Sequence, residues 1–250
     1  LVQSVYDSYK NNPKQFVDRI NSYGLNKPLG LPIKGEGVPV IPQPGTNRWS
    51  GVALPWMAFG YGLSVTPLQT LTLYNAVAND GVMVKPIFVS EIKEWNKTIK
   101  KFNTEVINPK ICSQETLDKV QAVLENVVKK GTGSKLYSKD FSMAGKTGTA
   151  QVNYKDKSKL YYASSFVGYF PADEPKYSCI IVVHKPNVAA GYYGADVAGP
   201  VFKRIAQKIF TDSPSTNHVK NIDAKVVSQE KNYSEYYKKV EKEERIIPNV

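Results

Sequence analysis

Four consecutive residues, Lys146-Thr147-Gly148-Thr149, carry groups that acyl transfer requires around its nucleophile. A lysine on a strand at the lip of a cleft supplies fixed positive charge, and the two threonine hydroxyls can bind a substrate carboxylate. Glycine between the threonines lets a substrate backbone approach closely, and the backbone N–H of Thr149 can donate to a developing oxyanion. The same tetrad also suits an ordinary glycine-containing strand with a surface lysine.

The residues around this tetrad predict a strand at about 143–153, and two further stretches predict strands at about 161–170 and 177–185. The clearest helix is expected to begin at Ser113, because apolar residues then follow a helical period. Gly131 is expected to end this helix, and the loop that it opens would give a flexible approach to the first strand.

The last helix is expected at residues 195–210. Four-residue spacing predicts one apolar face that covers the sheet, made of Val197, Val201, Ile205 and Ile209. Pro200 should either kink this helix or mark its true start.

The N-terminal part predicts a short helix at 13–24, with Pro13 in its first turn. Six prolines then indicate an extended, irregular loop over residues 25–56. Trp49 and Trp56 near the end of this loop either pack over the core or line a substrate groove.

A further helix is expected to be capped by Thr66, with Pro67 at its first position, and to end at Asp80-Gly81. Residues 84–94 and 98–107 predict the two strands of a hairpin around Asn96-Lys97.

Five other segments carry further sequence motifs. They are Phe59-Gly-Tyr-Gly-Leu-Ser-Val-Thr-Pro-Leu-Gln-Thr-Leu, Asn75-Ala-Val-Ala-Asn-Asp-Gly-Val-Met-Val-Lys-Pro, Val127-Val-Lys-Lys-Gly-Thr-Gly-Ser, Ala163-Ser-Ser-Phe-Val-Gly-Tyr-Phe-Pro and Tyr192-Tyr-Gly-Ala-Asp-Val-Ala-Gly-Pro-Val-Phe-Lys-Arg-Ile-Ala. Together with the K-T-G triplet, these segments resemble class B penicillin-binding proteins of the division type, in family order over residues 1–211.

The resemblance implies an α/β fold in the broad sense, α+β in the strict sense, with an antiparallel sheet flanked by helices. It would be part of the penicillin-binding, serine β-lactamase-like transpeptidase fold. By matching motif positions, Lys146 would support proton transfer, and Thr147, Gly148 and Thr149 would bind substrate or β-lactam. The implied parent enzyme is a serine-type D,D-transpeptidase that cross-links peptidoglycan stem peptides during septal wall synthesis, without a cofactor.

The family's nucleophile motif, S-x-x-K, and its S-x-N motif should both precede the F-G-Y-G segment. The S-x-x-K strings of this chain, which begin at Ser90 and Ser228, both follow that segment. Ser90 also lies in a strand-like stretch, where Lys93 would point to the opposite face. The one S-x-N, at Ser215, lies in the charged tail. The resemblance therefore implies that the nucleophile lies upstream of this chain, which would be inactive alone.

Two domains are expected: a C-terminal portion of the transpeptidase domain at 1–211, and a charged linker or tail at 212–250 that leads to a PASTA module or stays disordered. The resemblance also implies an extracytoplasmic, periplasmic location, with the parent anchored by an N-terminal membrane helix. The implied partners are stem peptides, β-lactams and division or elongation membrane proteins. Strands missing from the sheet would leave an unpaired edge, which invites dimerisation.

Composition limits the other classes of function. The net charge of +11 suits anionic partners or a solvated lysine-rich surface, but no nucleic-acid-binding signature is present. The two cysteines and two histidines lack metal-ligand spacing. Two alternatives stay open at this point: a β-lactamase-like sensor or hydrolase, and a non-catalytic module that faces the cell wall or membrane.

Overall fold

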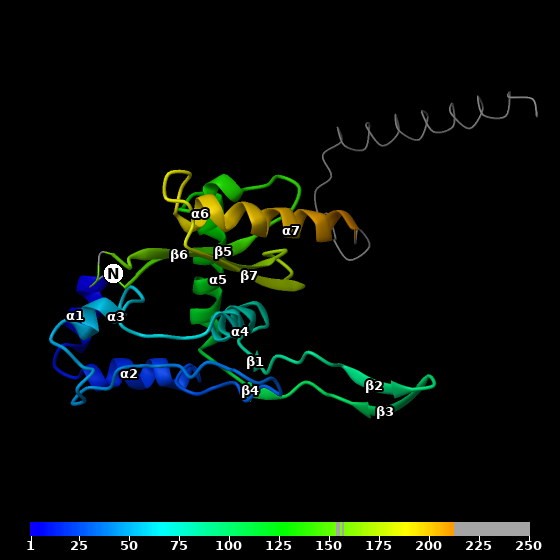
Figure 1. The fold of residues 1–250 in the computed structure, drawn as a ribbon, viewed down its shortest axis with the longest axis horizontal. Coiled ribbons are helices and arrows are strands. Elements are labelled where there is room, and N and C mark those ends of the chain that lie inside the picture. The colour runs from blue at the N-terminus through cyan, green and yellow to red at the C-terminus, as the bar shows by residue number, and fades with distance from the viewer. Residues whose placement is uncertain (154–155, 157, 213–250) are drawn as a thin grey trace, which may run out of the picture. The chain divides into compact units, whose positions relative to one another are not determined.

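The computed structural model of the chain describes residues 1–153, 156 and 158–212 (Figure 1). Residue contacts divide the chain into Leu1–Ile209 and Phe210–Val250. In chain order the elements are α1 (Val2–Tyr9), α2 (Pro13–Ser22), α3 (Ala53–Met57), α4 (Pro67–Ala78), β1 (Met83–Val84), β2 (Glu91–Glu94), β3 (Lys97–Lys101), β4 (Val106–Asn108), α5 (Gln114–Lys129), a 3₁₀ turn (Ser134–Leu136), β5 (Ala144–Val152), β6 (Tyr161–Phe170), β7 (Tyr177–His184), α6 (Gly194–Val197) and α7 (Gly199–Asp212).

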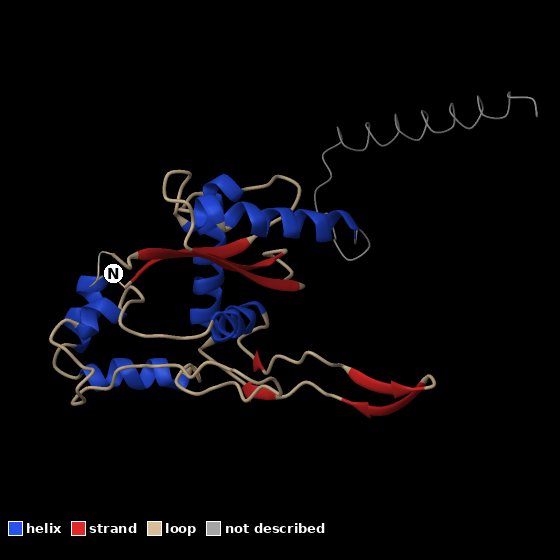
Figure 2. Ribbon diagram, in the orientation of Figure 1, coloured by secondary structure: helices blue, strands red, loops and turns tan. Residues whose placement is uncertain are grey.

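An antiparallel sheet of three strands, in the order β5-β6-β7, lies between helices (Figure 2). Side chains alternate between its faces. On one face Tyr169 and Ala144 are buried against Leu117 of α5, and α4 packs beside them. On the other face the Phe166 ring meets the Phe202 ring of α7, with 4.7 Å between centroids. The predicted antiparallel sheet flanked by helices is therefore confirmed.

Two strands form the edges of this sheet. Both β5 and β7 pair with β6 alone among the described strands. The expected unpaired edge is therefore present on the outer side of β7 within the described residues, and β5 exposes the edge that carries the tetrad.

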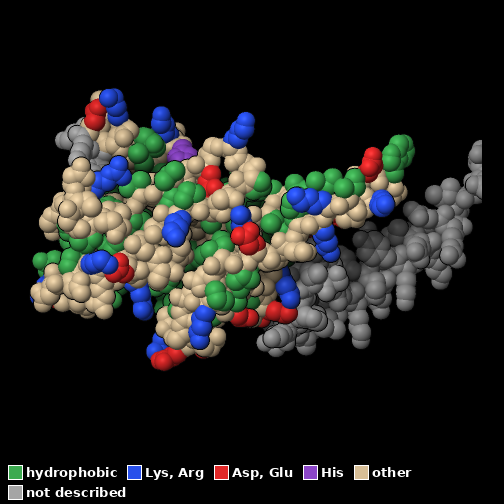
Figure 3. Space-filling model, turned by 90° about the horizontal axis from the view of Figure 1, so that it is seen from below, with side chains coloured by type: hydrophobic (Ala, Val, Ile, Leu, Met, Phe, Trp, Pro, Cys, Tyr) green, Lys and Arg blue, Asp and Glu red, His purple; other side chains and the backbone are tan. Residues whose placement is uncertain are grey.

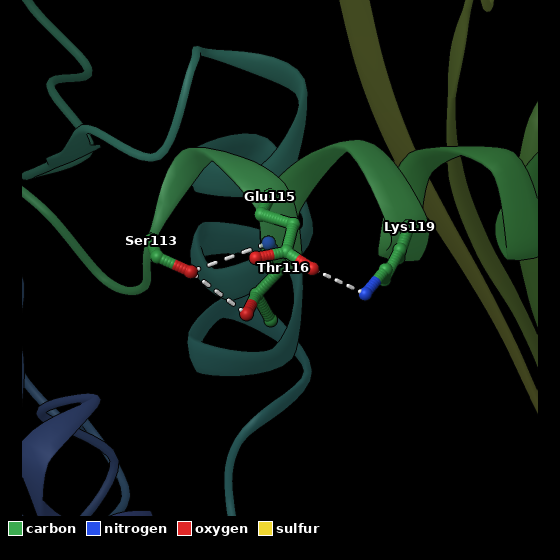
Figure 4. A network of polar contacts seen from close by, with 4 residues as sticks. All are labelled: Ser113, Glu115, Thr116 and Lys119. Atoms are coloured by element: carbon green, nitrogen blue, oxygen red, sulfur yellow. Dashed lines mark hydrogen bonds and ion pairs between the residues drawn. The ribbon is translucent and has the colours of Figure 1, made fainter.

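Side-chain caps fix where the two long helices beneath the sheet begin. The Thr66 hydroxyl accepts from the backbone N–H of Gln69 at 3.1 Å, and the Gln69 side chain accepts from the N–H of Thr66 at 2.9 Å. Ser113 accepts from the N–H of Thr116 at 3.3 Å, beside an ion pair within the same helix (Figure 4). Both predicted helix starts are confirmed.

The N-terminal segment packs as a smaller cluster. Val17 of α2 is fully buried with Ile41 and Met57, and Trp49 packs against them. The prediction of an irregular loop over 25–56 was wrong for its last residues, which form α3. Proline is tolerated in a first helical turn, and this segment gains burial of Leu54 and Met57 by coiling.

The predicted hairpin forms in two separate ladders. β2 and β3 pair around Trp95 and Asn96, which have φ of 46° and 66°, as tight hairpin turns require. The turn therefore lies one residue earlier than predicted, because Lys97 already pairs with Glu94. The outer arms separate, and β1 pairs with β4.

The last predicted helix is interrupted. α6 ends at Val197, and α7 starts at Gly199 with Pro200 in its first turn, so the proline marks a true start. The predicted apolar face was wrong for Val201, which is 42% exposed, whereas Phe202 is fully buried. The buried stripe lies one position further along the helix, at Ala198, Phe202 and Ala206, which are all fully buried. Two alanines in this stripe let the helix approach the sheet closely.

The basic surface has no single centre on the face seen in Figure 3, where lysine and arginine side chains lie scattered. Several surface lysines pair with acidic residues one helical turn away, as Lys14 does with Asp18. Such exposed pairs contribute little stability. This distribution supports a solvated lysine-rich surface.

Candidate functional site

The four predicted site residues lie together on edge strand β5. Lys146 lies opposite Val167 of β6, and Thr149 lies opposite Ser164. β5 lies at the end of the sheet, so one side of its backbone is not covered by a described strand. An extended ligand can pair with a strand edge of this kind through backbone hydrogen bonds.

Two contacts show which backbone groups point to the side of β5 that faces away from β6. The Gln151 N–H donates to the Tyr61 hydroxyl oxygen at 2.8 Å, away from β6. The Lys146 ammonium reaches the carbonyl oxygen of Thr147 at 3.0 Å on the same side. Backbone groups two residues apart in a strand share a side, so the Thr149 N–H also points to the open edge.

Lys146 lies against the strand rather than in an ion pair. Its ammonium donates to the Thr147 carbonyl at 3.0 Å and to the Thr147 hydroxyl at 3.1 Å. The side chain as a whole is exposed, but its ammonium lies close to protein atoms, and this partial burial lowers the pKa of Lys146 from its usual value. No acidic group of the described residues lies within ion-pair distance. The positive charge is thus available to an anionic ligand.

The two threonines of the tetrad have separate hydroxyl partners. The Thr147 hydroxyl lies 3.0 Å from that of Thr132, and the Thr149 hydroxyl accepts from the N–H of Gly194 at 3.0 Å. The Thr149 hydroxyl hydrogen is therefore free to donate to a ligand oxygen. Sequence reasoning missed Thr132 and Gly194 as site residues, because both contacts join residues from separate elements.

Two glycines, Gly148 of β5 and Gly194 at the start of α6, lie close to atoms of the sheet. A Cβ atom at Gly148 would lie 2.4 Å from the Ser165 hydroxyl oxygen. A Cβ atom at Gly194 would lie 2.2 Å from the Ser165 carbonyl oxygen and 2.4 Å from that of Gly148. The start of α6 therefore approaches β5 and β6 closely because Gly194 lacks a side chain.

Aromatic residues surround the far end of β5. The Trp56 ring packs against Phe59 and Tyr61, with centroids 6.5 and 6.0 Å apart. On the other side Tyr162 accepts from the Gln151 side-chain amide at 3.1 Å and stacks on Tyr192. Of the two predicted tryptophans, Trp49 packs over the core, and Trp56 joins the aromatic group at the strand.

The remaining serine candidates are not brought to the tetrad. Lys93 pairs with Glu91 at 2.7 Å, while Ser90 lies at the foot of the hairpin. Ser215 and Ser228 lie outside the described residues. Within the described part of the chain, no group of three or more histidine, cysteine or acidic side chains could hold a metal, and no helix is long and apolar enough to span a bilayer.

The sequence and the fold of this chain are those of a known family. Residues 4–207 match the model of the penicillin binding protein transpeptidase domain, and the chain belongs to this family. Its relatives are class B penicillin-binding proteins. The chain is 32% identical over 199 residues to peptidoglycan D,D-transpeptidase FtsI of Buchnera aphidicola, covering 78% of this chain and 33% of the relative. It is 32% identical over 193 residues to stage V sporulation protein D of Bacillus subtilis, covering 74% and 29%.

Solved structures agree with this assignment. Penicillin binding protein 3 of Mycobacterium tuberculosis aligns with a TM-score of 0.69 and 28% identity, over 81% of this chain and 47% of that chain. Related structures of that protein hold aztreonam and ampicillin. The chain spans about a third of the length of the curated relatives it matches.

Proposed function

We propose that this chain is the C-terminal portion of a serine-type peptidoglycan D,D-transpeptidase that cross-links stem peptides during septal wall synthesis. The observation that carries the proposal is the edge strand itself. It combines a Lys146 ammonium that has no acidic partner among the described residues, two threonine hydroxyls and a Thr149 N–H that points to the open side.

In the proposed reaction a serine attacks the carbonyl of the penultimate D-Ala and releases the terminal D-Ala. An amine of a neighbouring strand then takes the acyl group. Lys146 supports proton transfer and attracts the substrate carboxylate, which Thr147 and Thr149 bind through their hydroxyls. The Thr149 N–H donates to the oxyanion, a contact worth about 3–4 kcal/mol in the transition state. A β-lactam enters the same site and forms a slow ester.

In this proposal the nucleophile is the serine of an S-x-x-K motif outside these 250 residues, and the backbone N–H of that serine is the second oxyanion donor. The proposed domain is 1–211, with 212–250 as a charged tail. The names of the relatives support a transpeptidase over a β-lactamase-like sensor or hydrolase. Without the nucleophile, this chain alone would be a non-catalytic module that faces the wall or membrane.

We also propose an extracytoplasmic location at the membrane, with division or elongation membrane proteins as partners. The outer edge of β7, which no other described strand covers, supports self-association of this chain as a dimer. Sedimentation over a range of concentrations tests the dimer: a monomer at every concentration would count against it.

The test of the function is intact-mass spectrometry after incubation with benzylpenicillin. We expect a covalent adduct on the full-length gene product, none on this chain alone, and a strongly slowed adduct in full-length Lys146→Ala. An adduct on this chain would identify a serine such as Ser90 or Ser228 as the nucleophile. Absence of an adduct on the full-length protein would overturn the proposal.

A further inference from the structure

We infer that Thr132 is a positioning residue, which orients the Thr147 hydroxyl so that its hydrogen points to the substrate carboxylate. The inference rests on the proposed function, because it concerns the same site. The contact that suggests it is the 3.0 Å separation between the Thr132 and Thr147 hydroxyl oxygens.

The backbone around Thr132 is held firmly at the end of α5. The N–H groups of Gly131 and Gly133 donate to the carbonyl of Val127 at 3.1 and 3.0 Å. A Cβ atom at Gly131 would lie 2.9 Å from the Val127 Cα, and one at Gly133 would lie 3.2 Å from the Val127 oxygen. The two glycines thus let the loop wind tightly, which presents the threonine between them to β5.

The donors and acceptors at Thr147 explain what Thr132 can do. A hydroxyl has one hydrogen to donate and two lone pairs to accept with. The Lys146 ammonium can only donate, and at 3.1 Å it occupies one lone pair of the Thr147 oxygen. If Thr132 donates into the second lone pair, the single Thr147 hydrogen is left for a third partner.

A bound carboxylate favours donation from Thr132 to Thr147 over donation from Thr147 to Thr132. Either threonine can donate in the contact between them, but an anion accepts hydrogen bonds and does not donate them. When a carboxylate lies beside Lys146, donation from Thr147 to the anion is favoured, and Thr132 then donates to Thr147. Loss of the Thr132 hydroxyl should therefore slow the reaction of a substrate that has the carboxylate more than that of one without it.

The test compares acylation of the full-length protein by benzylpenicillin and by its methyl ester, which lacks the carboxylate charge. We expect Thr132→Val to slow acylation by benzylpenicillin roughly tenfold, the effect of losing one hydrogen bond to a charged system, and to change acylation by the ester less than twofold. Thr132→Ser keeps the hydroxyl and should restore the wild-type rate. Thr98→Val on the exposed hairpin is the matched control.

A double variant separates positioning from an independent contact. Because Thr132 acts through Thr147, Thr132→Val should add little to the loss caused by Thr147→Val. Equal losses with both β-lactams, no loss in Thr132→Val, or failure of Thr132→Ser to restore the rate would each overturn the inference. A wild-type protein that is not acylated at all would instead refute the proposed function.

Discussion

The backbone N–H of Gln151 donates a hydrogen bond to the hydroxyl oxygen of Tyr61, at 2.8 Å. This contact joins the F-G-Y-G segment to the strand that carries the tetrad, across 90 positions of sequence. It also occupies the open edge of β5 two residues beyond Thr149. A ligand that pairs along this edge can therefore use Thr149 but meets the tyrosine at Gln151.

We expect Tyr61→Phe to expose the Gln151 amide, because the acceptor is removed while the ring remains. Hydrogen exchange at Gln151 should become faster, with little change in global stability, since an edge N–H can bond to water instead. Tyr162→Phe is the matched control: it removes the contact to the Gln151 side chain and leaves the backbone contact intact. Unchanged exchange in Tyr61→Phe would show that the contact does not protect this edge.

Lys146→Ala should separate activity from folding. In the full-length protein we expect acylation by a β-lactam to fall about 100- to 1,000-fold, since a preorganised charge beside the reacting groups is lost. The free energy of unfolding should change by less than about 0.5 kcal/mol, because the side chain is exposed and forms no ion pair with described residues. Lys146→Arg keeps the charge and tests its placement. Near-normal acylation by Lys146→Ala would remove the lysine from the proposed site.

Local sequence patterns were sufficient for the parts of this fold that local interactions determine. The capped starts of α4 and α5 and the three strands of the sheet follow from residues within a few positions of each other. The buried face of α7 could not be predicted, because two neighbouring series with four-residue spacing are apolar, one through Val201 and one through Phe202. Only the packing against the sheet shows that the Phe202 series is the buried one. The contacts of Thr132 and Tyr61 with β5 depend on tertiary packing, which no local pattern contains.

Gly194→Ala should destabilise the contact between α6 and β5. The added Cβ would lie 2.2 and 2.4 Å from two backbone oxygens, which cannot rotate away. We expect a loss of about 1–3 kcal/mol in the free energy of unfolding, measured by urea denaturation of this chain. Gly51→Ala is the control, because a Cβ atom at that position would meet no other atom within 4 Å. Equal stability of the two variants would mean that the start of α6 is free to shift.

Tyr169→Phe should stabilise the chain at neutral pH. The Tyr169 side chain is fully buried, and its hydroxyl oxygen has no hydrogen-bond partner among the described residues. Removing an unsatisfied buried hydroxyl should raise the free energy of unfolding by about 1 kcal/mol. Tyr162→Phe serves as the control, since that hydroxyl accepts from Gln151 and its removal should bring no gain.

The same substitution should also change the response to alkaline pH. Burial first, and then the nearby Glu125 carboxylate, raise the pKa of Tyr169 to about 12 from 10.0. Between these values the unfolded chain loses the phenol proton while the folded chain keeps it, so folding stability falls as pH rises from about 10 toward about 12. Tyr169→Phe removes this contribution, and urea midpoints measured from about pH 9 to about pH 11.5 should fall less steeply than in the wild type. Parallel pH profiles would mean that Tyr169 ionises equally in both states, and that its hydroxyl is hydrated rather than buried.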